Sequence, residues 1–133
     1  MILLDTHVLL WLDSGSNELG ARSRKVIDAA FAREQLAVSA ISFWEVTMLQ
    51  EKNRLSIAQD LAGWRRELLD SGLVEMPVDG DVGILAGALR NFHGDPADRM
   101  IVAAALRHGT ELLTADRRIL DWNGRLLRHD ARQ

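Results

Sequence analysis

The chain has 133 residues, 47% of them hydrophobic and 26% charged, which is the composition of a globular protein, so we expect a single domain over residues 1–133. A formal net charge of −3 excludes a strongly basic nucleic-acid-binding protein, and the absence of cysteine excludes disulfides and thiolate metal sites. No apolar stretch is long enough to span a membrane, and Asp5 and His7 interrupt the apolar run of the N-terminus, so we expect a cytoplasmic protein without a signal peptide.

The first half of the chain alternates short apolar runs with helical patterns. Residues 2–4 are wholly apolar, as in a strand buried on both faces of a sheet, and residues 8–12 begin a short helix. Apolar positions recur at helical spacing over residues 18–34, and residues 36–40 predict a second buried strand. A further helix is expected from Ser42, through the segment SFWEVTMLQEKNRL.

The second half repeats this alternation. Gly72 and Gly109 stand where two helices would end, and Pro96 stands at the first turn of the second of them. The predicted elements are helices over residues 58–72, 79–92 and 95–109 and strands over residues 73–78, 111–114 and 125–129. Alternating strands and helices predict an α/β domain with a mostly parallel central sheet of four to five short strands, flanked by helices.

Four acidic residues occupy positions where a site could form. Asp5 and Asp116 each follow a predicted strand, where parallel sheets bind their ligands. Glu45 and Asp98 lie in the first turns of predicted helices. Each also has a structural alternative: Asp5 and Asp116 as helix caps, Glu45 in a capping box with Ser42, and Asp98 as a charge at the positive end of a helix dipole.

Taken together, the four acids indicate a metal site. Two strand ends and two helix starts are expected to face the same edge of the sheet. Carboxylates gathered there would repel one another, and burial would raise their pKa values unless a cation were bound. Mg²⁺ prefers oxygen ligands and commonly uses one or two carboxylates together with water and phosphate. The pattern therefore predicts a divalent cation as the partner of Asp5.

The same acids carry a resemblance to a known family. The segments LLDTHVLLW, AISFWEV, FHGDPADRMIVAAAL and ELLTADRRI follow one another along nearly the whole chain. With these motifs the chain resembles the PIN-domain ribonucleases of the VapC type, the toxin halves of bacterial toxin–antitoxin pairs. The resemblance implies that Asp5, Glu45, Asp98 and Asp116 are catalytic and bind one or two Mg²⁺ or Mn²⁺ ions for phosphodiester hydrolysis.

A division of roles is expected among these residues. Asp5 and Asp98 would hold the main Mg²⁺, and Asp116 would belong to a second, weaker metal site, with Glu45 as a further candidate there. Asp5, Asp98 and Asp116 are thus the expected metal ligands. Hydrolysis would leave a 5′-phosphate and a 3′-hydroxyl, as the resemblance implies.

Supporting residues and partners follow from the same resemblance. Thr6 and Thr114 are expected to orient the carboxylates, although a threonine that bonds only local backbone fits these positions equally well. The expected partners are an RNA substrate, a small antitoxin whose C-terminal segment crosses the acidic groove, and a second copy of the chain in a homodimer.

Other polar side chains near the motifs have mainly structural interpretations. Asp95 precedes Pro96 and is expected to cap the following helix. The histidines lack the paired spacing of a zinc site, and a structural role is favoured for His7 and His93 over contact with substrate. Arg99 or Arg117 could clamp the phosphate backbone of the substrate. Three tryptophans at apolar helix positions are expected in the core: Trp11, Trp44 and Trp64.

Several other functions compete with this one. A phospho-acceptor receiver domain would need a lysine after a late strand, but Lys25 and Lys52 both lie in the first half of the chain. A P-loop NTPase would need a lysine that directly follows a glycine, and neither lysine of this chain follows a glycine. Two alternatives stay open: a PIN-fold nuclease that acts on DNA or in RNA processing, and a PIN-like binding module without catalysis.

Overall fold

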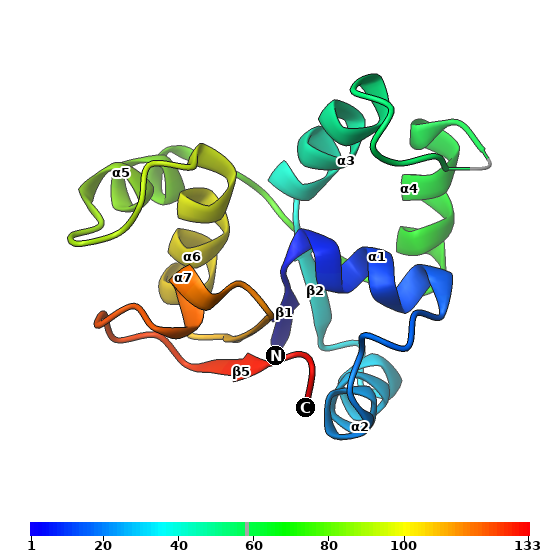
Figure 1. Cartoon of the computed structure of the whole chain (residues 1–133), viewed down its shortest axis with the longest axis horizontal. Coiled ribbons are helices and arrows are strands. Elements are labelled where there is room, and N and C mark those ends of the chain that lie inside the picture. Colours follow the sequence, from blue (N-terminus) through cyan, green and yellow to red (C-terminus); the bar gives the residue numbers. More distant parts are fainter. Residues whose placement is uncertain (58) are drawn as a thin grey trace.

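Five short strands form one sheet in the computed structural model, which describes residues 1–57 and 59–133 (Figure 1). The strands are β1 (Ile2–Leu4), β2 (Leu36–Ser39), β3 (Val74–Met76), β4 (Glu111–Thr114) and β5 (Arg128–Asp130). Their order is β3-β2-β1-β4-β5, and every neighbouring pair is parallel. The central strand β1 places Leu3 opposite Ala37 and Leu112. The expected α/β domain with a mostly parallel sheet is therefore confirmed.

Helices cover both faces of this sheet. The helices are α1 (Thr6–Ser14), α2 (Ala21–Ala32), α3 (Ile41–Glu51), α4 (Leu61–Asp70), α5 (Gly80–Ala88), α6 (Pro96–His108) and α7 (Arg117–Leu120). In Figure 1, α5, α6 and α7 lie on one side of the sheet and α1 to α4 lie on the other. Within the described part of the chain, none of the helices combines the length and the apolar character that crossing a membrane requires.

The two faces explain why the first strand is wholly apolar. Successive side chains of a strand point to opposite faces. Leu3 packs into a cluster with Ile101 of α6, whereas Leu4 packs into a second cluster with Ile27 of α2 and Val46 of α3. Because both leucines are fully buried, the strand that leads to Asp5 is fixed on both sides.

Several helix boundaries differ from the sequence-based expectation, and those of α3, α4 and α5 bear on the site or differ most. Helix α3 begins at Ile41 and has no side-chain cap, so the capping box of Ser42 with Glu45 is not formed and that alternative is wrong. Helix α4 begins after Asp60, which caps it, and the expected start at residue 58 lies outside the described residues. Helix α5 ends at Ala88, four residues earlier than expected. The first difference matters most, because it leaves Glu45 available for the site.

The tryptophans divide between core and surface. Trp64 is buried and donates its Nε1–H to Asp13 at 3.1 Å, and Trp11 packs at the edge of the same core. Trp44 is 50% exposed, so its expected core position is wrong. The buried residues of α3 are Ser42 and Val46, four positions apart on one helix face, and Trp44 midway between them points to the opposite face.

Candidate metal centre

Four carboxylates from separate elements gather at the carboxyl ends of β1 and β4. Asp5 and Asp116 follow these strands, Glu45 lies on α3, and Asp98 lies in the first turn of α6. Two groups of three side chains each offer ligand atoms that lie within 4.8 Å of one another. We call Asp5, Glu45 and Asp98 the first trio, and His93, Asp98 and Asp116 the second trio. Asp98 belongs to both, so the two trios adjoin.

Asp5 is buried and held by two hydrogen bonds. Its Oδ1 accepts from the Thr6 backbone N–H at 2.8 Å, and its Oδ2 accepts from the Thr114 hydroxyl at 2.7 Å. His7 Nδ1 lies 3.7 Å from the same Oδ2, and His7 Nε2 accepts from the Ala115 N–H at 3.1 Å. Asp5 therefore caps α1 and faces the site at once, and Thr114 contacts it as a supporting residue would.

Glu45 is positioned by Thr6. The Thr6 hydroxyl is hydrogen-bonded both to the Glu45 carboxylate and to the Ser42 hydroxyl. Because a hydroxyl carries one proton and a carboxylate only accepts, Thr6 donates to Glu45 and accepts from Ser42. Burial raises the pKa of Glu45 above its usual range; the hydrogen bond from Thr6 opposes that shift, and the charges of Asp5 and Asp95 add to it.

The charged form of Asp98 is disfavoured by burial and by the neighbouring carboxylates. Burial, together with the negative charges of Asp5, Asp95, Asp116 and Glu45, raises the pKa of Asp98 to about 8. An ordinary aspartate has a pKa near 4, so the site disfavours the charged form strongly. A cation among these oxygens would reverse that preference. The donor set of the first trio, three carboxylates and no nitrogen, fits a hard divalent cation such as Mg²⁺ or Mn²⁺.

Asp116 forms an ion pair with the guanidinium of Arg118. Burial alone would raise the pKa of Asp116, but hydrogen bonds from the Arg118 guanidinium and backbone N–H outweigh it, and the net pKa is lowered. The guanidinium lies 3.0 Å from Asp116 Oδ2 and 3.4 Å from Asp98 Oδ2. Arg117, one of the two arginines named from the sequence as examples of a phosphate clamp, instead pairs with Asp121 and Asp130, which are not among the four site acids. Sequence reasoning missed Arg118.

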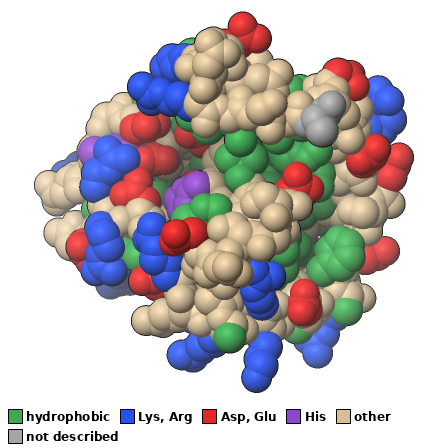
Figure 2. Space-filling view, turned by 45° about the vertical axis from the view of Figure 1, so that its right-hand side comes forward, with side chains coloured by type: hydrophobic (Ala, Val, Ile, Leu, Met, Phe, Trp, Pro, Cys, Tyr) green, Lys and Arg blue, Asp and Glu red, His purple; other side chains and the backbone are tan. Residues whose placement is uncertain are grey.

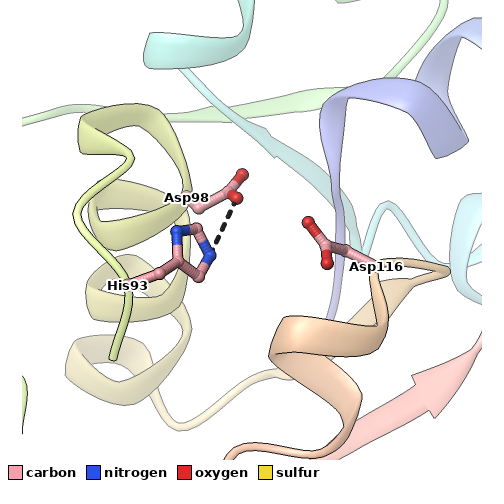
Figure 3. Close-up of side chains that lie close together, drawn as sticks. All are labelled: His93, Asp98 and Asp116. Carbon is pink, nitrogen blue, oxygen red and sulfur yellow. Dashed lines mark ion pairs between the residues drawn. The ribbon is translucent and has the colours of Figure 1, made fainter. Parts of the chain in front are cut away.

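His93 also lies closer to the acids than the sequence suggested. Figure 3 shows its ring beside Asp98, with Asp116 facing both from the loop after β4. His93 Nε2 lies 3.2 Å from Asp98 Oδ2, yet this buried nitrogen makes no hydrogen bond within the described residues. His93 Nδ1 accepts from the Asp95 N–H at 3.3 Å. Burial, with the charge of Arg118, lowers the pKa of His93, so the ring is neutral at physiological pH.

Two carboxylates at the site also cap helices, as the sequence predicted. Asp95 caps α6, accepting from the N–H groups of Ala97 and Asp98, as the sequence predicted. Asp116 likewise caps α7 and accepts from the Arg118 N–H at 2.8 Å. Capping and membership of the acidic cluster are therefore compatible, because caps place carboxylates at the strand ends where the cluster forms.

Arg99, the other arginine named from the sequence as an example, donates to backbone carbonyls rather than to the four site acids. Its guanidinium donates to five carbonyl oxygens at the end of α5 and in the following loop: those of Ala86, Gly87, Leu89, Phe92 and His93. These bonds fix the loop that carries His93 to the first turn of α6. The assignment of Arg99 as a phosphate clamp is wrong, because its donors are used by the protein itself.

Replacing Arg99 with lysine is therefore expected to destabilise the fold. An ammonium group cannot reproduce the planar fork, so several partly buried carbonyls would lose their donor. We expect the free energy of unfolding to fall by about 1–3 kcal/mol, measured by urea denaturation. Arg107→Lys on the exposed end of the same helix is the matched control and should change it by less than about 0.5 kcal/mol. Equal effects of the two substitutions would contradict the role of Arg99.

The sequence and the fold are similar to those of known proteins. The sequence profile of the family described as PIN domain matches residues 2–123. The protein named Ribonuclease VapC22, from Mycobacterium tuberculosis, is 36% identical over 119 residues, covering 89% of this chain and 88% of that protein.

Solved structures share the fold at lower identity. A toxin–antitoxin complex from Klebsiella pneumoniae contains a chain with a TM-score of 0.65 and 22% identity, over 98% of both chains. A DNA-bound VapBC from Salmonella typhimurium gives a TM-score of 0.70 and 20% identity, over 97% of this chain and 96% of that one. VapBC2 from Rickettsia felis, bound to a promoter DNA fragment, gives a TM-score of 0.70 and 15% identity, over 97% of this chain and 98% of that one. At these identities the likeness shows the fold.

Proposed function

This chain belongs to the PIN domain family and is of the VapC type, and from that premise we propose that it is a divalent-cation-dependent ribonuclease that hydrolyses RNA phosphodiester bonds. The observation that carries the proposal is the first trio, in which buried Asp5 from the end of β1, partly buried Glu45 from α3 and buried Asp98 from α6 meet. Arg118 contacts Asp98 at 3.4 Å, and within the described residues neither Asp5 nor Glu45 pairs with a lysine or arginine. Oxygen ligands of this kind suit Mg²⁺ or Mn²⁺.

Asp5, Asp98 and Glu45 would hold the ion together. The sequence favoured Glu45 for a second site with Asp116, whereas the geometry groups Glu45 with Asp5 and Asp98. A bound divalent ion supplies an acidified water and Lewis-acid polarisation of the phosphate. The Thr114 hydroxyl keeps an Asp5 oxygen in place.

The second trio would face the RNA backbone. His93 Nδ1 accepts from the Asp95 N–H, and its buried Nε2 lies 3.2 Å from Asp98 Oδ2, so His93 would position Asp98 rather than bind a phosphoryl oxygen. Arg118 adds a positive charge beside Asp116, on a side chain that is 59% exposed. Both groups lie within reach of the shared carboxylate Asp98.

RNA cleavage by the purified chain tests the proposal. With Mg²⁺ or Mn²⁺ we expect cleavage that leaves a 5′-phosphate and a 3′-hydroxyl, and EDTA should abolish it. Asp5→Asn, purified in the same way, controls for contaminating nucleases and should be inactive. Cleavage that persists in EDTA, or that leaves a 2′,3′-cyclic phosphate, would contradict the proposal.

We also propose that a small antitoxin silences this nuclease, as in the toxin–antitoxin complexes that share its fold. A groove of about 480 Å³ lies between α1 and α4, and His7 lines it while lying next to Asp5. Leu10, Trp11 and Trp64 are among the apolar side chains that line it, and Asp13 and Glu67 are among the polar ones. Figure 2 shows hydrophobic side chains gathered in a hollow, with acidic, basic and histidine side chains beside it. A segment leaving this groove would reach the first trio. Formation of a homodimer stays a prediction.

A further inference from the structure

The two trios differ in what neutralises them. Asp116 in the second trio accepts two hydrogen bonds from the Arg118 side chain, one from Nε at 3.3 Å and one from the terminal nitrogen at 3.0 Å. The same terminal nitrogen donates to Asp98 at 3.4 Å. One guanidinium therefore spans both carboxylates of the second trio. Arginine retains its charge under all ordinary conditions, so this cation is permanent.

His93 completes the second trio in a form that does not suit a metal. A metal-binding imidazole offers a lone pair from one nitrogen and usually donates a proton from the other. Here Nδ1 accepts a hydrogen bond from the Asp95 N–H, so the proton of the neutral ring lies on Nε2, the nitrogen that faces Asp98. His93 thus presents an N–H group to the cluster. A cation at the second trio would have to displace Arg118 from both carboxylates.

The first trio contains no histidine, and among the described residues Arg118 contacts it only through the shared Asp98, at 3.4 Å. Its three members are carboxylates, and the hydrogen bonds on Asp5 and Glu45 come from neutral donors, namely the Thr6 N–H, the Thr114 hydroxyl and the Thr6 hydroxyl. Neutral donors orient carboxylates without cancelling their charge. Within the described residues, the charges of Asp5 and Glu45 are therefore not cancelled by a lysine or arginine, whereas Asp98 shares Arg118 with Asp116.

We propose that Arg118 occupies the second cation position of the site, so that the protein binds one divalent ion at the first trio and uses the guanidinium in place of a second. This inference rests on the proposed function, which requires the first ion, and it assigns a role to a residue outside the four acids. Its consequence for the substrate is that a phosphate at the second trio meets an arginine, which can bind two phosphoryl oxygens through its planar fork.

The number of bound Mn²⁺ ions tests this role without measuring activity. Free Mn²⁺ is quantified by its electron paramagnetic resonance signal during titration of the wild-type protein at about pH 8. Two neutral variants, Arg118→Gln and Arg118→Met, remove the guanidinium, so that poor folding of one leaves the other to report. Arg117→Gln is the matched control, because this substitution removes the same charge from the neighbouring position of the same short helix. Arg117 itself pairs with Asp121 and Asp130.

We expect about one Mn²⁺ per chain for the wild type and for Arg117→Gln, and about two for the Arg118 variants. Two ions in the wild type would overturn the inference, as would a single ion in the folded Arg118 variants, whether its affinity changes or not. A second ion in Arg117→Gln would also overturn it, because the effect would then reflect net charge. No Mn²⁺ binding by the wild type would instead refute the proposed function.

Discussion

Replacing Asp98 with asparagine is expected to lower the rate of Mg²⁺-dependent RNA cleavage by roughly 10³-fold or more. Asp98 is the residue common to both trios, and it lies between Asp5 and Glu45 on one side and Asp116 on the other. Asparagine has nearly the same shape, but its amide carries no charge and offers one oxygen instead of two. The variant should therefore fold normally and lose the ligand around which the cluster is arranged.

Single-turnover cleavage of a labelled RNA, at saturating protein and Mg²⁺, measures this loss. Asp81→Asn is the matched control: Asp81 is an exposed aspartate near the start of α5, and its only described ion pair, with Arg107, is long at 3.5 Å. We expect that control to cleave within about twofold of wild type. Cleavage by Asp98→Asn within tenfold of wild type would contradict the assignment of Asp98 as a metal ligand.

The same substitution is expected to stabilise the metal-free protein at alkaline pH. The pKa of Asp98 is raised to about 8 in the fold, against about 3.9 in an unfolded chain, so the folded state binds the proton more tightly. The stability that Asp98 contributes is therefore fully present below pH 4 and is lost as pH rises through about 8. Between pH 5 and 8 this one group would lower the free energy of unfolding by up to about 4 kcal/mol.

Urea denaturation in EDTA, from pH 5 to 9, measures this dependence. Wild type should lose stability steadily as pH rises, and the raised pKa of Glu45 acts in the same direction. Asp98→Asn should remove most of the slope and exceed wild type by about 1–3 kcal/mol near pH 8.5. At pH 5 the two proteins should agree within about 1 kcal/mol, because Asp98 is then protonated. Parallel pH profiles of stability for wild type and the variant would show that the fold does not raise the pKa of Asp98.

Much of the fold could be predicted because its central strands β1, β2 and β4 are largely apolar on both faces. The segment of residues 2–4 cannot be exposed on either side, and that fact alone indicates a central strand of a covered sheet. Once the strands alternate with helices, their parallel arrangement places Asp5 and Asp116 at the same edge. The gathering of these two acids therefore follows from local patterns and topology.

The role of Glu45 was ambiguous for a local reason. A serine three residues before a glutamate at a helix start is the pattern of a capping box, and the pattern does not state which residue begins the helix. The helix begins at Ile41, so Ser42 is already inside it and bonds to Thr6. A shift of one helix boundary changes what Glu45 faces, and boundaries are the feature that sequence periodicity determines least well.

The arginines and His93 could not be ranked from the sequence. Arg117 and Arg118 are adjacent, and on a four-residue helix their directions differ by about 100°, so only tertiary structure decides which one meets Asp116. Arg99 lies next to Asp98 yet turns toward the carbonyls at the end of α5. His93 precedes its helix in a loop, where periodicity carries no information on direction.

The effect of Mg²⁺ on the unfolding temperature near pH 8.5 tests the central claim, that the shared carboxylate Asp98 needs a divalent cation, most directly. At about 100 times its dissociation constant, Mg²⁺ should stabilise wild type by about 2.7 kcal/mol and raise its unfolding temperature by roughly 5–10 °C. Asp98→Asn, although more stable without metal, should gain less than about 2 °C. If Mg²⁺ leaves the unfolding temperature of wild type unchanged, or raises it equally in both proteins, the account is contradicted.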